Sequence, residues 1–306
     1  MSEIENKNLY PDEETPVLKH YSEFDSVYVG LLPFFKLEKE HCDTNSSKKV
    51  ISLEEARKKD EIFEKIENYS NMTIYSSNEC YPTDEEITQY GQKITWNEVI
   101  QNTKLNDYKE LNKALMTSIG AFKKKLERQE LLKVLNQYSD KNNIWHPTEG
   151  TFDFFTKSSI FELLTLTGIK EVVVEDEFYE SKKTIDLTNI NKIDFCEKVG
   201  FKDYYIYDKN KSILFAISWD YFFYFAAIND KVFSKKSIES NLEGFWADEK
   251  CSHLWTWEEG EIDRLLNTEN EKKLVATTYK NNGGNLANRK DSNSNKLWSK
   301  LKSLWS

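Results

Sequence analysis

The residues best suited to chemistry gather in one acidic, tryptophan-rich stretch, EGFWADEKCSHLWTW, which runs from Glu243 to Trp257. Burial beside tryptophan raises the pKa of a carboxyl group toward neutrality, and this is one way in which proteins make a general acid. An enzyme with a small-substrate cleft near His253 is therefore one interpretation. Its titratable groups would come from Glu243, Asp248, Glu249, His253, Glu258 and Glu259.

The same stretch also suits recognition of another protein. Tryptophan supplies large apolar contact area at interfaces, and surrounding carboxylates attract basic partners. We favour this second interpretation, in which a face built by residues 245–257 receives a protein with a basic surface. A plain role in the core is the third. The expected contact residues are Trp246, Asp248, Glu249, His253 and Trp255.

Two His/Cys pairs carry the ligand types that zinc prefers, His41-Cys42 and Cys251-x-His253. Neither pair has the spacing of a zinc finger, and adjacent residues point their side chains in different directions. If the second pair lies in a strand, alternation places four residues on one face, as lining of the core or of a groove: Cys251, His253, Trp255 and Trp257. We predict no metal site and no cofactor.

Motifs for nucleotide binding and hydrolysis are absent from the sequence. It contains no GxxxxGK[ST] or GxGxxG loop, no GxSxG elbow, no HExxH and no EF-hand loop. Ten glycines in 306 residues leave few places for a backbone cradle around phosphate. We therefore expect binding rather than catalysis.

Composition and charge restrict the partner and the compartment. A net charge of −10 disfavours nucleic acid, because DNA binding needs clustered cations. The four cysteines are far apart without a CxxC motif, as in a reducing cytosol. The N-terminus has no secretory signal, and the longest apolar run, residues 213–228, is shorter than the ~20 residues of a membrane-spanning helix. We expect a cytoplasmic protein.

Hydrophobic patterning predicts the α+β class, with a mostly antiparallel sheet and packed helices. The expected organisation is a mainly helical region over 1–145, an α+β core domain over 146–265, a polar linker over 266–295 and an amphipathic helix over 296–306. The order of elements within 146–265, a helix and a strand, then a helix, two strands and a helix, is typical of an antiparallel α+β domain.

Within the N-terminal region, two capping signals and one apolar stripe predict three helices. Ser52 with Glu55 and Thr95 with Glu98 have capping-box spacing, which predicts helices that begin at about 53 and 96. A stripe of apolar residues three or four apart predicts a long helix over 106–138. Before these, residues 27–37 contain a proline and are predicted to be an edge strand or an extended loop.

Within the core domain, predicted helices begin after Ser159 and Thr188 and end at Gly168 and Gly200. Residues 170–175 have the β-branched composition of a strand. Two further strands, 203–207 and 212–218, are separated by turn-forming residues and predict a hairpin. Residues 219–228 are apolar on every side, and we predict a buried helix there.

The last residues, NKLWSKLKSLWS, have helical spacing of their apolar side chains and lysines elsewhere. Such a segment suits an anionic membrane surface, so a peripheral membrane protein is a further alternative. Docking on its own domain or on another copy, and disorder, are the other two. The apolar face would consist of Leu297, Trp298, Leu301, Leu304 and Trp305.

Two segments, YIYDKNKSILFAISWD at Tyr205–Asp220 and EGFWADEKCSHLW at Glu243–Trp255, resemble an uncharacterised bacterial family known as a domain of unknown function. The resemblance covers about residues 145–258. The hairpin and the aromatic segment after it also resemble, more loosely, small α+β immunity proteins of bacterial toxin systems. That second resemblance implies neutralisation of a toxin by binding. Neither resemblance supplies catalytic residues.

Overall fold

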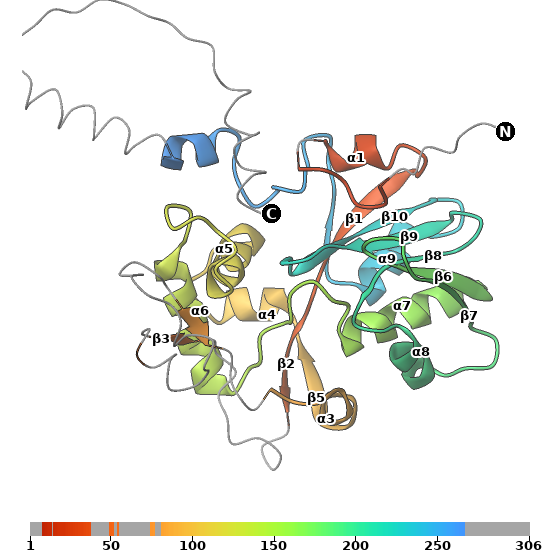
Figure 1. Ribbon diagram of the computed structural model, residues 1–306, viewed down its shortest axis with the longest axis horizontal. Coiled ribbons are helices and arrows are strands. Elements are labelled where there is room, and N and C mark those ends of the chain that lie inside the picture. Colours follow the sequence, from red (N-terminus) through yellow and green to blue (C-terminus); the bar gives the residue numbers. More distant parts are fainter. Residues whose placement is uncertain are drawn as a thin grey trace, which may run out of the picture. The chain divides into compact units, whose positions relative to one another are not determined.

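A seven-stranded antiparallel sheet is the centre of the fold (Figure 1). The computed structural model describes residues 8–13, 15–37, 49–51, 54, 74–76 and 81–266. Residues 1–262 form one compact unit, and residues from 263 onward form another. The strand order is β11-β1-β10-β9-β8-β6-β7, and each neighbouring pair is antiparallel. The predicted α+β class is confirmed.

The main sheet draws its strands from both halves of the chain. They are β1 (Ser26–Leu31), β6 (Glu171–Asp176), β7 (Lys182–Asp186), β8 (Asp203–Tyr207), β9 (Ile213–Ile217), β10 (Phe223–Ile228) and β11 (Gly244–Trp246). Two small sheets pair β2 (Phe34–Leu37) with β5 (Gly91–Ile94) and β3 (Lys49–Ile51) with β4 (Ile74–Ser76).

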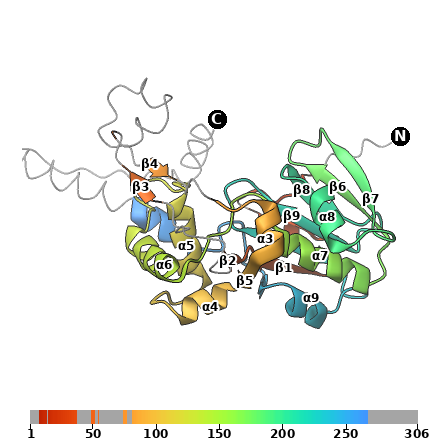
Figure 2. The ribbon, with the colours of Figure 1, turned by 90° about the horizontal axis from the view of Figure 1, so that it is seen from below.

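The helices fall into two groups in the figures (Figures 1 and 2). One group, α4 (Trp96–Gln101), α5 (Tyr108–Ser118) and α6 (Gln129–Asn142), packs together. The other, α7 (Phe154–Leu166), α8 (Lys192–Lys198) and α9 (Lys235–Asn241), lies beside the main sheet, with α7 touching both α8 and α9. Two short helices are α1 (Val17–His20) and α3 (Asp84–Tyr90).

The predicted buried helix over 219–228 is wrong, because this segment contains β10. Residues 219–222 form a turn in which Asp220 has a φ of 63°, and β10 then runs from Phe223 to Ile228 with every residue buried. A strand covered on both faces carries a continuous apolar run without alternation. Periodicity alone cannot separate such a strand from a buried helix.

Residues 27–37 divide into two strands on either side of Leu32 and Pro33. The first, β1, pairs with β10 on one side and β11 on the other, so it is not the edge strand that the proline suggested. The proline lies in the link between β1 and β2, where no ladder needs its missing N–H. The N-terminal half of the chain thereby contributes a strand to the central sheet.

The predicted long helix over 106–138 is two helices, α5 and α6. They pack against each other, and the chain reverses between them at Gly120, which has a φ of 71°. Because both helices bury an apolar stripe, the sequence pattern runs through the break. The helix predicted from about residue 53 lies outside the described residues, apart from residue 54.

Other helix predictions are confirmed, with shifts at their starts. Thr95 caps α4 by accepting from the Glu98 N–H. The helix before Gly168 starts at Phe154 instead of about 160, because Asp153 is its cap. The helix before Gly200 starts at Lys192, with Asn191 as its cap. The predicted strand before residue 176 and the hairpin of β8 and β9 are confirmed.

Side chains of β10 show which segments cover each face of the sheet. Tyr224 contacts Phe152, which precedes α7. On the opposite face, Phe225 contacts Tyr10 and Tyr21 from the N-terminal segment. Phe223, also on that face, contacts Trp255. The centre of the sheet is therefore buried between the segment that leads into α7 on one side and the segments 8–25 and 247–257 on the other.

One prediction concerns close packing at the centre of the sheet. Gly30 lies opposite Tyr224, and a Cβ atom on Gly30 would be 2.2 Å from the Tyr224 ring. Tyr224 is fully buried, so its ring cannot move aside without disturbing the core. We expect Gly30→Ala to lower the free energy of unfolding in urea by about 1–3 kcal/mol.

The matched control is Gly200→Ala. Its Cβ atom would meet only the Asp203 carboxylate at 3.5 Å, an ordinary contact. An equal loss of stability in both variants would contradict this account of the close approach.

Candidate functional site

Residues 251–257 of the predicted contact segment fold as turns rather than as a strand, whereas Phe245 and Trp246 belong to β11. The Trp255 N–H donates to the Ser252 carbonyl oxygen, and the Trp257 N–H donates to the Leu254 carbonyl oxygen. These turns press Cys251, His253, Trp255 and Trp257 against the core, and all four are buried. Of the five predicted contact residues, Asp248 and Glu249 are exposed, Trp246 is half-buried, and His253 and Trp255 are covered.

His253 is enclosed by aromatic rings. Its imidazole centroid lies 4.2 Å from that of Tyr221, 5.1 Å from that of Tyr10 and 6.1 Å from that of Phe223. Burial lowers the pKa of His253 from 6.5 to about 3, although exposed Asp12 acts in the opposite direction. Neither ring nitrogen has a hydrogen-bond partner among the described residues. His253 is therefore a neutral side chain of the core.

Trp246 is engaged by the neighbouring helix α9. Its indole N–H donates to the Glu239 carboxylate at 2.7 Å, and the Lys235 ammonium lies 4.9 Å from its ring centroid. Tyr28 of the adjoining strand packs edge-on against the same ring. The Trp246 side chain is therefore engaged in contacts within its own chain.

The acids of this stretch also have structural partners. Glu243 accepts from the backbone N–H groups of Trp96 and Asn97, both at 2.8 Å, and so caps α4. Burial raises the pKa of Glu243, and these two hydrogen bonds oppose the shift. Glu258 forms an ion pair with Lys109, which lowers the pKa of Glu258.

A different surface displays aromatic side chains. Phe178 is 74% exposed, Phe201 is 60% exposed and Trp219 is 55% exposed. They come from three turns, which follow β6, α8 and β9 respectively. Large apolar side chains grouped on a surface mark sites of interaction. Together with two acids of the same turns, they form what we call the sheet-end patch: Phe178, Phe201, Trp219, Glu177 and Asp220.

The pairing of the strands brings these turns together. Asp176 at the end of β6 pairs with Asp203 at the start of β8, and Tyr205 pairs with Ala216 near the end of β9. All three turns therefore leave the sheet at the same end. Residues 150–151 tie two of them together, because the Gly150 N–H donates to the Tyr221 carbonyl oxygen and the Thr151 hydroxyl donates to that of Phe201.

The sheet-end patch is acidic. Burial raises the pKa of Glu177, and the nearby carboxylates of Asp176 and Asp220 raise it further. Burial, then Glu177 and Asp220, raise the pKa of Tyr204 to about 12. Carboxylates from two turns thus share one electrostatic environment. The third turn contributes an exposed cation, Lys202, which follows Phe201 in the chain.

Sequence reasoning missed this patch. Trp219 and Asp220 were assigned to a buried helix, and the turn after β6 drew no prediction. One signal was present, since lone aromatic residues stand beside short polar segments that separate strands. Asp220 and Tyr179 both adopt positive φ, at 63° and 60°, as residues of tight turns do.

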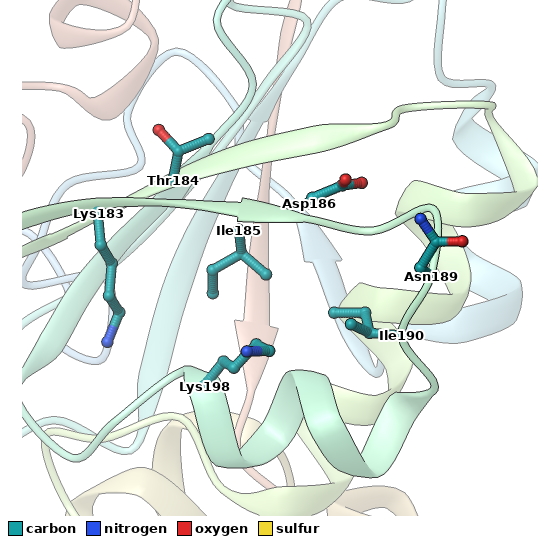
Figure 3. Close-up of a pocket in the computed structure, with 7 residues that line it drawn as sticks. All are labelled: Lys183, Thr184, Ile185, Asp186, Asn189, Ile190 and Lys198. Atoms are coloured by element: carbon teal, nitrogen blue, oxygen red, sulfur yellow. The ribbon is translucent and has the colours of Figure 1, made fainter.

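A pocket of about 320 Å³ lies between β7 and α8, not at His253 (Figure 3). Its lining carries two lysines, Lys183 and Lys198, and two isoleucines, Ile185 and Ile190. The catalytic interpretation of the sequence placed a small-substrate cleft beside His253. In the structure, that position is filled by aromatic side chains.

Several sequence predictions fall outside the described residues. These are His41 with Cys42, and the terminal apolar face of Leu297, Trp298, Leu301, Leu304 and Trp305. In the part of the chain that the structure describes, no three His, Cys, Asp or Glu side chains are grouped as metal ligands. The helices there are too short or too polar to cross a membrane.

Comparison with known proteins places the sequence in a family. Residues 13–257 match the model of a protein family of unknown function, DUF2711. The chain belongs to this family. The match includes the central sheet, the turns of the sheet-end patch and the segment that contains His253.

The chain is similar in sequence to the uncharacterized protein YwbB of Bacillus subtilis (strain 168). It is 22% identical over 248 residues, which are 81% of this chain and 97% of YwbB. No solved structure matches the chain. The family assignment agrees with the resemblance of Tyr205–Asp220 and Glu243–Trp255 to a domain of unknown function.

The burial of His253 predicts a dependence of stability on pH. The folded protein keeps His253 neutral down to about pH 3, whereas the unfolded chain protonates it near pH 6.5. Stability is therefore unaffected by this group above pH 6.5 and falls as the pH decreases below it, by about 1.4 kcal/mol per pH unit. Urea unfolding at pH 7.5, 6.5, 5.5 and 4.5 measures this slope.

The comparison variant is His253→Phe, which keeps a ring in the aromatic surroundings and removes the titrating group. We expect its free energy of unfolding to fall less steeply with decreasing pH than that of the parent protein. Parallel profiles between pH 6.5 and 4.5 would show that His253 is protonated in the folded state.

Proposed function

We propose that this chain is a non-catalytic, cytoplasmic binding protein and that the sheet-end patch receives a partner protein with a basic surface. The observation that carries the proposal is the display of three large aromatic side chains, each more than half exposed, at one end of a rigid sheet. The proposal keeps the acidic aromatic surface expected from the sequence. It moves that surface from residues 245–257 to the turns after β6, α8 and β9.

The aromatic side chains supply a reason to bind. Burial of an aromatic side chain removes about 150–250 Å² from water. At about 25 cal/mol per Å², covering the exposed part of one ring contributes roughly 2–4 kcal/mol before the costs of association. Phe178, Phe201 and Trp219 together give enough apolar area for the centre of a modest interface.

The acidic surroundings supply a preference among partners. Asp176, Glu177 and Asp220 lie close enough to raise one carboxyl pKa, and the whole chain carries a net charge of −10. A basic partner would relieve the repulsion between these carboxylates. Its approach would also be accelerated by the field of the protein, in a salt-dependent manner.

Two of the groups that the catalytic alternative would use serve the fold instead. His253 is neutral and enclosed, and the Glu243 carboxylate accepts two backbone N–H groups of α4. A binding function requires only a structural role of these two residues. These contacts support binding over catalysis.

Photo-crosslinking in cells tests which surface meets a partner. We expect p-benzoylphenylalanine in place of Phe178 to yield adducts with a discrete basic protein. The matched control carries the same group in place of Leu166, which is also 74% exposed. Leu166 is the last residue of α7, whereas the patch lies near the first residues of that helix. Adducts of equal yield and pattern at both positions, or none at Phe178, would contradict the proposal.

Charge reversal tests the electrostatic part of the proposal with the crosslinked partner in hand. We expect Glu177→Lys to reduce the association rate by about tenfold at low salt, and less at high salt, because it removes steering toward the patch. The control variant is Glu197→Lys, at an exposed position of α8, which makes the same change in net charge. Equal rates for these two variants, measured by stopped flow or surface plasmon resonance, would show that net charge alone matters.

A further inference from the structure

The pocket between β7 and α8 has an apolar floor and a basic rim. Alternation along β7 directs Lys183 and Ile185 toward α8, while Thr184 and Asp186 point to the other side of the strand (Figure 3). Ile190, from the loop before α8, extends the floor, and Lys198 from the last turn of α8 rises beside it. Ile185 is 4% exposed, so the floor is a fixed part of the core.

The two lysines differ in their surroundings. The Lys183 ammonium lies 2.7 Å from an oxygen of Asp203, a carboxylate that also accepts from the Gly200 N–H. Among the described residues, no carboxylate lies within ion-pair distance of Lys198. The charge left without a partner at the rim is therefore that of Lys198.

One carboxylate, that of Asp186, is also among the residues that line the pocket. Asp186 accepts from the backbone N–H and the hydroxyl of Thr188, and these hydrogen bonds lower the pKa of Asp186. Its side chain lies on the far side of β7 from Lys198 (Figure 3). The side of the pocket that faces α8 thus carries its two lysines, on a protein whose net charge is −10.

We propose that this pocket binds a small aliphatic carboxylate. The carboxylate would take the charge-assisted contact that Lys198 offers, with Lys183 beside it. The hydrocarbon chain would cover Ile185 and Ile190. A volume of about 320 Å³ is at the lower end of the range for ligand pockets, which restricts the ligand to a short chain. This site is separate from the sheet-end patch and does not depend on a protein partner.

Titration of the full-length protein with hexanoate tests the proposal. Ile δ1-methyl NMR follows the two floor residues directly. We expect saturable shifts at Ile185 and Ile190, weaker binding of butyrate than of hexanoate, and no saturable shift with hexylamine. Lys198→Gln should weaken hexanoate binding by about tenfold, because it removes one charge-assisted hydrogen bond.

The matched control is Lys141→Gln, which removes an exposed lysine from the last turn of α6. It should leave the hexanoate titration unchanged. The proposal is overturned if Ile185 and Ile190 show no saturable shift, if the two lysine variants bind equally, or if hexylamine binds as well as hexanoate. Inorganic phosphate that produces the same shifts with equal affinity would also overturn it, since the aliphatic chain would then contribute nothing.

Discussion

The antiparallel pairing of β1 with β10 is the constraint on which the rest of the structure depends. It joins residues 26–31 to residues 223–228, almost two hundred positions later in the chain. With β1 fixed there, Leu31 donates its N–H to the Glu243 carbonyl oxygen, and the Trp96 indole donates to the Leu32 carbonyl oxygen. These bonds attach β11 and α4 to the same centre. The hydrogen bonds between the helical region and the sheet thus depend on the position of β1.

Much of the local structure around this centre was predictable from the sequence. The hairpin of β8 and β9 and the strand β6 were predictable because each combines β-branched or aromatic residues with short turns. β10 was not, since a strand buried on both faces has the same continuous apolarity as a buried helix. Nor was the break between α5 and α6, because the apolar stripe continues through the residues that separate the two helices. Partner strands decide these cases, and they lie far away in the chain.

The candidate site shows the same limit more sharply. An abundance of tryptophan and acid at 245–257 predicted a recognition surface, yet the turns of that segment fold Trp255 and His253 inward. Composition indicates how apolar a segment is, but not which of its side chains are buried by other segments. Trp219 looked like core and is exposed because it stands in the turn between β9 and β10. The acidic aromatic character was predictable, whereas its place depended on the register of the sheet.

A partner that covers the sheet-end patch would protect its three turns from solvent. Hydrogen–deuterium exchange of the complex with the crosslinked partner tests this most directly, because each turn reports separately. We expect slower exchange in residues 176–180, 200–202 and 218–221, with residues 246–250 unchanged. Protection confined to residues 246–250, around Asp248 and Glu249, would contradict it and return the recognition surface to the place that the sequence first suggested.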